Sequence, residues 1–407
     1  MIEGRSHVGS PVDWSDAPEM NKGKGERPMR TPIYLDYNAT TPIDPAVAEA
    51  MAPYLYEHFG NPSSAHPYGV KAREATETAR AQVAALLGCR PAEVVFTSGG
   101  TESNNHALKG VALAGHGTRR RIITSAVEHP AVVEVCDWLA TQGFEITVLP
   151  VDETGQIEPD DLARAIGPDT LLVTLMHANN EVGTIQPIRA LAEIAHSQGA
   201  LFHTDAAQAV GKIPAKVDDL GVDLLSVAGH KLYAPKGVGA LYIREGVHLA
   251  KLLHGAGQEQ GRRPSTENVL GIVGLGKACD VAGHDAEVER ARLEGLRDRL
   301  HRGLVHALGE ERVRLNGHPD ARLPNTLNLS FRDVQANTLL AEISHEVAAS
   351  AGAACHADAV NVSAVLQAMD VPIAWAMGTV RFSVGRPTTA AEIDRAIEVV
   401  VAAVRRR

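Results

Sequence analysis

Short runs of β-branched and aliphatic residues recur between about Pro45 and Ile243, and polar or amphipathic stretches separate them. Continuous apolar runs of this length, flanked by turn residues, are typical of strands that are buried on both faces. We predict such strands at residues 93–97, 121–124, 145–150, 171–175, 200–205, 223–227 and 239–243.

Helical patterns fill the intervals between these runs. Two of them, at residues 70–88 and 188–199, end at a glycine, which suits the position just after a helix C-terminus. Strand–helix alternation over such a length predicts a mostly parallel sheet that is covered by helices on both faces. The predicted fold class is therefore α/β.

The pattern changes after about residue 285. A long charged helix at 285–309 is followed by apolar segments at 325–331 and 378–384 and by a final helix. That helix opens with Thr389-Ala-Ala-Glu392, a capping box in which the threonine oxygen and the glutamate satisfy free N–H groups. We predict a large domain at residues 46–284, a smaller α+β domain at 285–407, and a segment at 31–45 that joins the small domain.

Residues 1–30 differ from the rest of the chain. They are polar and aperiodic, and they lack the apolar segment of a signal peptide. The sequence "IEGR" within them resembles the recognition site of a protease that is used to remove tags. We predict that these residues are largely disordered and take no part in the fold.

The composition of the chain excludes several classes of protein. The net charge of −10 provides no broad basic surface for nucleic acid or a membrane. The four cysteines lack C-x-x-C spacing, which argues against a zinc site and a disulfide framework. No apolar run reaches the roughly 18 residues of a membrane-spanning helix. We expect a cytoplasmic protein without a bound metal.

Residues with chemical potential gather where the predicted strands end, which is where ligands bind in an open parallel sheet. The segment "SGGTESNN" (98–105) reads as a glycine-rich turn into a helix, whose free N–H groups favour a phosphate, although a plain tight turn has the same pattern. His129, the segment 179–184, Asp205 and Gln208 follow later strands. Taken alone, His129 fits a core residue and Asp205 fits a helix cap.

Lys231 lies in "AGHKLYAPKGVGA" (228–240), directly after another predicted strand. Burial of a lysine at such a place lowers the pKa of its amine, as Schiff-base chemistry requires. A phosphate-binding turn, a carboxylate and this lysine are the parts that a pyridoxal phosphate enzyme needs. Their order at successive strand ends predicts an enzyme of this kind.

Five segments are similar to motifs of one family, and "YLDYNATTP" and "RFSVGRPTT" flank them: "GNPSSAHPYG", "FTSGGTESNN", "HTDAAQ", "GHKLYAPKGVGALY" and "GRRPSTENV". The chain resembles the class V, fold-type I pyridoxal phosphate enzymes, and closely the cysteine desulfurases of the NifS/IscS type together with the selenocysteine lyases. The resemblance runs from Tyr34 through the last helix. It implies a seven-stranded, mostly parallel sheet domain, a smaller C-terminal domain and a homodimer.

The resemblance also implies which residues hold the cofactor ring. Lys231 would bind pyridoxal 5'-phosphate as a Schiff base, and Asp205 would pair with the pyridine nitrogen. Gln208 would bond the side of the ring that carries the hydroxyl. His129 would stack on the ring and act as a second acid or base.

By the same resemblance, two further groups bind the phosphate and the substrate. The phosphate ligands would be Gly100, Thr101, His230 and, from the partner subunit, Thr266. The residues that hold the substrate carboxylate would be Asn38, Asn180, which also contacts the cofactor, and Arg381, whose fork suits a carboxylate.

Cys355 follows a run of small residues in "ASAGAACHAD" (349–358). By itself such a cysteine is more commonly a small apolar residue. The resemblance makes it the nucleophile that takes sulfur or selenium from the substrate and holds it on a mobile loop. Cys89, Cys136 and Cys279 keep the structural interpretation.

Two departures from the family pattern leave alternatives open. Ala228 stands where the family often has a serine that binds the phosphate. The segment "GAACHAD" is closer to selenocysteine lyases, whereas Pro130 after Glu128-His129 is typical of bacterial NifS-like desulfurases.

We predict a cysteine desulfurase that converts L-cysteine to L-alanine, keeps the sulfur as a persulfide on Cys355 and transfers it to an acceptor protein. The alternative is a selenocysteine lyase acting on L-selenocysteine. The remaining alternatives are an inactive sulfur-carrying scaffold and an aminotransferase.

Overall fold

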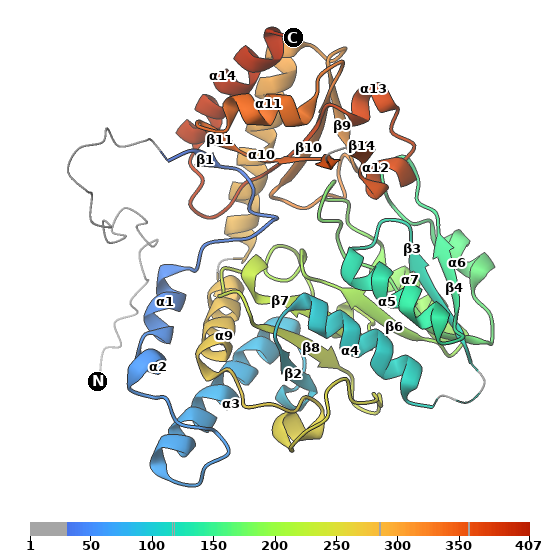
Figure 1. The fold of residues 1–407 in the computed structure, drawn as a ribbon, viewed down its shortest axis with the longest axis vertical. Coiled ribbons are helices and arrows are strands. Elements are labelled where there is room, and N and C mark those ends of the chain that lie inside the picture. Colours follow the sequence, from blue (N-terminus) through green and yellow to red (C-terminus); the bar gives the residue numbers. More distant parts are fainter. Residues whose placement is uncertain (1–30, 116, 118, 285, 357–358) are drawn as a thin grey trace, which may run out of the picture.

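The computed structural model describes residues 31–407 apart from residues 116, 118, 285 and 357–358, and in the segment 353–361 it describes only backbone. Figure 1 shows a large lower part and a smaller upper part. The predicted disorder of residues 1–30 concerns a segment outside the described residues. No helix of the described residues is long and apolar enough to cross a membrane.

A seven-stranded sheet forms the centre of the large part. Its strands are β2 (Val94–Thr97), β3 (Arg121–Ser125), β4 (Glu145–Leu149), β5 (Thr170–Thr174), β6 (Leu201–Asp205), β7 (Leu224–Ala228) and β8 (Gly239–Ile243). They lie in the order β2-β8-β7-β6-β5-β3-β4, and β8 is antiparallel to both of its neighbours. The predicted α/β class with a mostly parallel sheet is confirmed.

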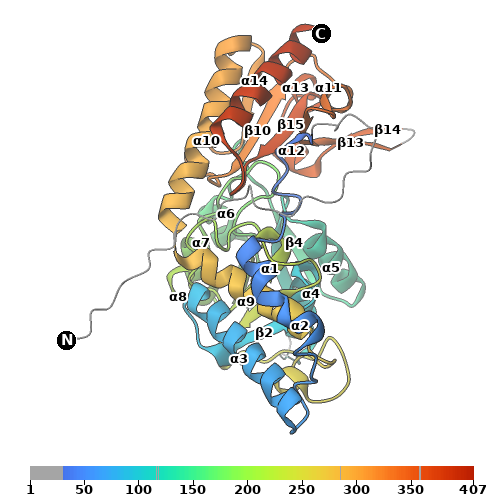
Figure 2. The same ribbon diagram turned by 90° about the vertical axis from the view of Figure 1, so that its left-hand side faces the viewer.

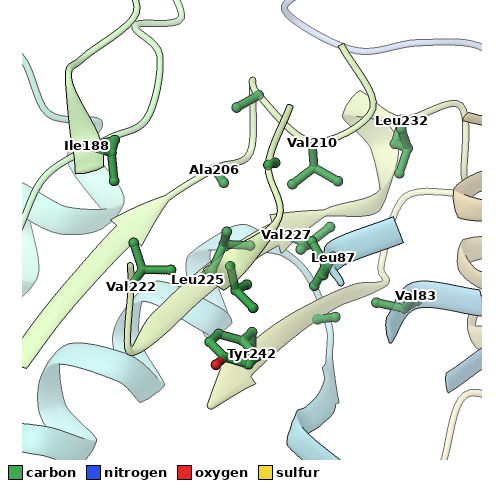
Figure 3. Close-up of a cluster of buried hydrophobic side chains, with 14 of the residues drawn as sticks. Val83, Leu87, Ile188, Ala206, Val210, Val222, Leu225, Val227, Leu232 and Tyr242 are labelled. Carbon is green, nitrogen blue, oxygen red and sulfur yellow. The ribbon is translucent and has the colours of Figure 1, made fainter. Parts of the chain in front are cut away.

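Helices cover both faces of this sheet because the strand residues alternate between the faces and are apolar on each. One face carries α4 (Gly100–Leu113) and α5 (Pro130–Thr141). The other carries α3 (Pro67–Leu87), α7 (Ile188–Ser197) and α9 (Val269–His284). Figure 3 shows part of the second core, in which Leu225, Val227 and Tyr242 of the sheet lie near Val83 and Leu87 of α3.

Shorter elements connect these layers. They are the helices α1 (Pro45–Met51), α2 (Pro53–Tyr56), α6 (Pro159–Ala165) and α8 (Val217–Leu220), and the single 3₁₀ turns η2 (Pro91–Glu93), η3 (Gly229–Lys231) and η4 (Gln258–Gly261).

The small part contains an antiparallel sheet in the order β12-β15-β10-β9. Its strands are β9 (Val313–Asn316), β10 (Thr326–Phe331), β12 (Ser350–Ala351) and β15 (Thr379–Ser383), and helices α10 (Ala286–Leu308), α11 (Ala336–Ile343) and α14 (Ala390–Arg405) pack with it. The predicted capping box opens α14: Thr389 Oγ1 accepts the Glu392 N–H at 3.2 Å, and the Glu392 carboxylate accepts the Thr389 N–H at 2.8 Å.

The N-terminal segment pairs with the small part of the chain. Strand β1 (Ile33–Tyr34) runs parallel to β11 (Val347–Ala348). We propose that residues 31–45 and 285–407 form one domain and residues 46–284 the other. This pairing and the separate apolar cores of the two parts support that division.

Cys355 belongs to a hairpin that extends from the smaller part of the chain. The hairpin consists of β13 (Ala353–His356) and β14 (Ala359–Val362), and Figure 2 shows it projecting from that part. At its base, Gly352 N–H donates to Thr379 O at 2.8 Å and Ser363 N–H donates to Gly352 O at 3.0 Å. The hairpin is therefore held on β15, and helices α12 (Ala364–Ala368) and α13 (Ile373–Ala376) follow it.

Candidate active site

A cavity lies where the carboxyl ends of the parallel strands meet the N-terminal segment and β15. Its volume is about 330 Å³, within the roughly 300–1,000 Å³ of small-molecule sites. The predicted site residues that line it are Asn38, Gly100, Thr101, His129, Asn180, Asp205, Gln208, His230, Lys231 and Arg381. The fold thus brings together residues from almost the whole length of the chain.

Asp205 ends β6 and is almost completely buried. Its Oδ2 accepts a hydrogen bond from Asn104 Nδ2 at 2.7 Å, and its Oδ1 accepts the Ala207 N–H at 2.9 Å. Two donors on different elements fix the orientation of this carboxylate in the cavity wall. A fixed carboxylate of this kind can accept a hydrogen bond from a positively charged ring N–H.

Lys231 ends the turn η3, directly after β7. Its Nζ donates to the main-chain oxygen of Asn38 at 2.5 Å and to that of Ala39 at 2.8 Å. Burial, with a smaller contribution from the charge of Arg381, lowers the pKa of Lys231 to about 8. A lowered pKa increases the fraction of neutral amine at neutral pH, and the neutral amine is the form that attacks an aldehyde.

His129 is the N-cap of α5, and its Nδ1 accepts the Ala131 N–H at 3.0 Å. Because Nδ1 is an acceptor, the proton of the neutral ring is on Nε2. Burial lowers the pKa of His129, although the nearby Asp205 charge opposes this shift. The imidazole is therefore mainly neutral at pH 7.

Glu128, next to His129, joins the ends of two strands. Its Oε1 accepts hydrogen bonds from Ser125 Oγ at 2.7 Å and from Met176 N–H at 2.9 Å, while Oε2 has no partner among the described residues. Burial raises the pKa of Glu128 to about 8, and the negative charge of Asp205 adds to the effect. The carboxyl group is therefore mostly protonated at neutral pH.

We expect Glu128→Gln to remove a pH dependence of stability. The raised pKa means that folding stability from Glu128 is fully present below about pH 4.5 and is lost as the pH rises to about 8. Relative to the variant, the wild type should lose up to about 1.4 kcal/mol of unfolding free energy per pH unit in this window. Urea unfolding of both cofactor-free proteins at pH 6, 7, 8 and 9 measures this difference. A difference that stays constant from pH 6 to 8 would contradict the assignment.

The N-terminus of α4 lies at one end of the cavity. The sequence predicted that a phosphate binds at this helix N-terminus. Gly99 precedes it with φ +151°, a conformation that side-chain-bearing residues rarely adopt, and Gly100 and Thr101 begin the helix. Helix N-termini present free N–H groups to anions. Burial lowers the pKa of His230 to about 4, so this neighbour is neutral. Ala228 lines the cavity here and offers no hydroxyl group.

Arg381, on β15, already has partners in the protein. Its Nη1 donates to Asn180 O at 2.9 Å, and its Nη2 donates to Asp36 Oδ1 at 2.8 Å. Ser350 Oγ donates to the same Asp36 oxygen at 2.9 Å. Arg381 Nε has no partner among the described residues. Asp36 and Ser350 thus hold the guanidinium group in place at the cavity wall.

Asn38 lines the cavity, but protein groups engage its side-chain amide. Nδ2 donates to Asn180 O at 3.1 Å and to Thr326 Oγ1 at 2.8 Å, and Oδ1 accepts from Asn325 Nδ2 at 3.0 Å. These bonds join the N-terminal segment to Asn180 beside the large sheet and to residues 325 and 326 at β10. A direct contact of Asn38 with substrate stays a prediction.

Thr266 is exposed and does not line the cavity of a single chain. The segment before it is anchored beside the N-terminus of α4. Arg80 donates to both oxygens of Glu259 at 2.8 Å, and Arg263 Nε donates to Glu102 Oε1 at 2.8 Å. Glu102 lies in the first turn of α4. A contact of Thr266 with a phosphate in a partner subunit stays a prediction.

The side chain of Cys355 lies outside the described residues, so its placement relative to the cavity stays a prediction. The three other thiols are described. Burial raises the pKa of Cys89, Cys136 and Cys279 to about 12 in each case. At neutral pH these three groups are thiols rather than nucleophilic thiolates.

The residues of the cavity fit pyridoxal phosphate. A fixed carboxylate (Asp205), an amine of lowered pKa (Lys231) and a helix N-terminus (α4) surround one space of suitable size. In addition, Asn104 Oδ1 is buried without a partner among the described residues. These are the groups that the ring nitrogen, the aldehyde and the phosphate require.

The family model described as "Aminotransferase class-V" matches residues 33–396. The chain belongs to this family. Within this family, the chain is 49% identical to "Cysteine desulfurase IscS" of Dictyoglomus turgidum (strain DSM 6724 / Z-1310) over 372 residues. The aligned residues make up 91% of this chain and 94% of the relative. Enzymes of the class-V aminotransferase family depend on pyridoxal phosphate. The resemblance predicted from the sequence is confirmed.

Solved structures of the same family agree with the fold. A protein described as "NIFS-LIKE PROTEIN" superposes with a TM-score of 0.86 at 38% identity and covers 91% of this chain and 99% of that chain. A structure described as "SspA in complex with cysteine" has a TM-score of 0.75 at 37% identity. Its superposition covers 86% of this chain and 98% of that chain.

Sequence reasoning did not identify several residues that the structure places at or beside the site. Asn104 and Glu128 lie within or beside segments already recognised, so proximity in the sequence was a signal for both of them. Asp36 lies in the recognised segment "YLDYNATTP", but no local signal indicated its pairing with Arg381, which is 345 positions away in the chain. Lys212, whose amine contacts Gln208, lies outside the recognised segments.

Proposed function

We propose that the protein is a pyridoxal phosphate-dependent cysteine desulfurase, which converts L-cysteine to L-alanine and keeps the sulfur as a persulfide on Cys355. One observation carries the proposal: a single cavity contains Lys231, Asp205 and Arg381 in a chain that is 49% identical to a protein named as a cysteine desulfurase. The relative described in complex with cysteine supports the same substrate class.

The residues of the cavity would hold the cofactor in the following way. Lys231 binds its aldehyde carbon, Asp205 accepts the N–H of its ring, and Gly100, Thr101 and His230 surround its phosphate. Bound there, pyridoxal phosphate supplies a covalent attachment for the substrate amine and draws electrons away from the substrate Cα. Thr266 of the partner subunit completes the phosphate site in a homodimer.

Arg381 and Asn180 orient the substrate through its carboxylate. The guanidinium is pre-positioned by Asp36, so binding does not require a search among rotamers. Released from the cofactor, Lys231 moves a proton at the substrate Cα, for which a pKa of about 8 is suitable. His129 is the second candidate acid or base, and in its neutral form it donates a hydrogen bond to the cavity through the N–H at Nε2.

Cys355 performs the sulfur transfer. Its thiolate attacks the sulfur of the substrate, so that an S–S bond forms and the C–S bond breaks. The electron pair of the broken bond stays with the carbon, which gains a proton and leaves as alanine. The raised pKa values of Cys89, Cys136 and Cys279 support the assignment of this step to the remaining cysteine.

We expect Arg381→Ala to raise the KM for L-cysteine roughly ten- to hundredfold, because a charge-assisted contact with the carboxylate contributes about 1.5–3 kcal/mol. The cofactor spectrum should change little. Arg381→Lys keeps the charge but loses the forked guanidinium, so its KM should lie between those of the wild type and Arg381→Ala. An unchanged KM in Arg381→Ala would remove this residue from the site.

The proposal is tested by measuring alanine formation from L-cysteine and from L-selenocysteine in parallel. A selenocysteine lyase remains the alternative because "GAACHAD" resembles those enzymes. Turnover of L-cysteine at a steady rate supports the desulfurase. Fast turnover of selenocysteine without any turnover of cysteine would instead identify a lyase.

We further propose that the persulfide is passed to an acceptor protein in the cytoplasm. A persulfide-transfer assay with proteins that co-purify with the chain would identify that acceptor.

A further inference from the structure

The turn after β6 places the side chains of Gln208 and Lys212 next to each other. The Ala209 and Val210 N–H groups donate to Ala206 O at 2.9 and 3.0 Å, so the turn is helical, and residues four positions apart in such a turn are neighbours. Gln208 and Lys212 have this spacing. Gly211 lets the turn lie against the segment that follows Lys231, because a Cβ there would be 2.0 Å from Leu232 Cδ1.

The amide of Gln208 has a defined orientation. Lys212 Nζ donates to Gln208 Oε1 at 2.7 Å, and Gln208 Nε2 donates to Asn38 O at 3.0 Å. The main-chain oxygen of Asn38 can only accept, which orients the amide, and Lys212 in its ammonium form can only donate and selects the same orientation. The second N–H of Nε2 is therefore the polar group that Gln208 has left for the cavity that it lines.

Lys212 has no other partner that would account for its position. Within the described part of the chain, Gln208 is its only hydrogen-bond acceptor and no ion pair includes it. Burial lowers the pKa of Lys212 to about 7, and the positive charges of Lys231 and Arg381 contribute. Lys212 is half-buried, and placing an amine there without an acidic partner brings little gain in stability, which points to a role at the site.

We propose that Lys212 is a positioning residue that keeps an N–H of Gln208 directed at the ring oxygen of the bound cofactor. This inference rests on the proposed function, since it concerns the same cavity. A hydrogen bond to that oxygen stabilises its negative charge and lowers the pH at which the lysine-bound cofactor loses its proton. Without Lys212 the contact with Asn38 O alone holds the amide, so its second N–H is less firmly directed at the ring oxygen.

The test is a double-mutant cycle of Lys212→Met and Gln208→Ala, read by absorbance. The loaded wild type, both single variants and the double variant are titrated with pH, and the midpoint of the visible-edge band is measured. In the wild-type background, Lys212→Met should raise the midpoint by roughly 0.4–1 pH unit, the size of one hydrogen bond. In the Gln208→Ala background it should produce no further shift.

Two controls accompany the cycle. Lys216→Met removes an exposed lysine from the same connection and should leave the midpoint unchanged. Thermal unfolding of the cofactor-free proteins shows whether each variant is folded. If Lys212→Met does not fold, the same cycle with Lys212→Leu decides the question.

An equal shift in both backgrounds would mean that the charge of Lys212 acts through space, and this result would overturn the inference. An unshifted midpoint in the wild-type background would overturn it too, while a normal wild-type band and alanine formation would leave the proposed function standing. A wild type that takes up no pyridoxal phosphate would overturn the proposed function and this inference together.

Discussion

Lys231→Ala should give a folded protein that binds pyridoxal phosphate weakly and forms no alanine above background. The variant loses the amine that attaches the cofactor and the group that moves the proton at the substrate Cα. Loss of the proton transfer alone costs roughly 10²–10⁴-fold in rate. Alanine formation, cofactor affinity and the visible-edge absorbance band are the three measurements. The band should disappear.

Lys231→Arg is the matched control for charge. It retains a cation that can donate to Asn38 O and Ala39 O, but a guanidinium does not form the covalent bond. It should be as inactive as the alanine variant, whereas Lys71→Ala, which alters an exposed residue of α3, should behave as wild type. Alanine production above a few per cent of the wild-type rate in Lys231→Ala would refute the assignment.

Cys355→Ala should abolish the formation of alanine from L-cysteine while the spectral change on addition of cysteine remains. Substrate binding depends on the cavity, whereas removal of the sulfur depends on a thiolate that can accept it. The assay must contain no added thiol, because a small thiol can take the place of the cysteine. Mass spectrometry of the wild type after reaction should find one additional sulfur on the peptide that contains Cys355.

Cys89→Ser is the control for this variant. Cys89 is half-buried and burial raises its pKa to about 12, so its replacement should leave the turnover of cysteine unchanged. Full activity of Cys355→Ala would refute the persulfide mechanism. Loss of activity in Cys89→Ser but not in Cys355→Ala would assign the sulfur transfer to Cys89 and would refute the proposal.

The strands of the central sheet could be predicted because they carry a local signal. A buried parallel strand is a short apolar run between turn residues, and each predicted run lies within one residue of its strand in the structure. Short or polar elements had no such signal. The two-residue strands β1 and β11 pair across more than three hundred positions, and only their partner makes them strands.

The sequence also provided no prediction for one long helix of the large part. The charged pattern at 285–309 identified α10, but α9 precedes it with only residue 285 between the two helices. Helix α9 is largely apolar and buried, so it has little of the amphipathic period that marks a surface helix.

By itself the sequence determined the fold class, the family and the chemical inventory of the site. Strand ends, glycine-rich turns and motif spacing are local properties, and residues at the carboxyl ends of parallel strands meet at one edge of the sheet. Only the tertiary structure decided which of these groups are engaged by other protein groups and which can contact a ligand. It pairs Arg381 with Asp36, engages the amide of Asn38, protonates Glu128 and places Lys212 behind Gln208. Such pairings and pKa shifts arise from burial and from contacts between distant segments, which no local pattern of residues encodes.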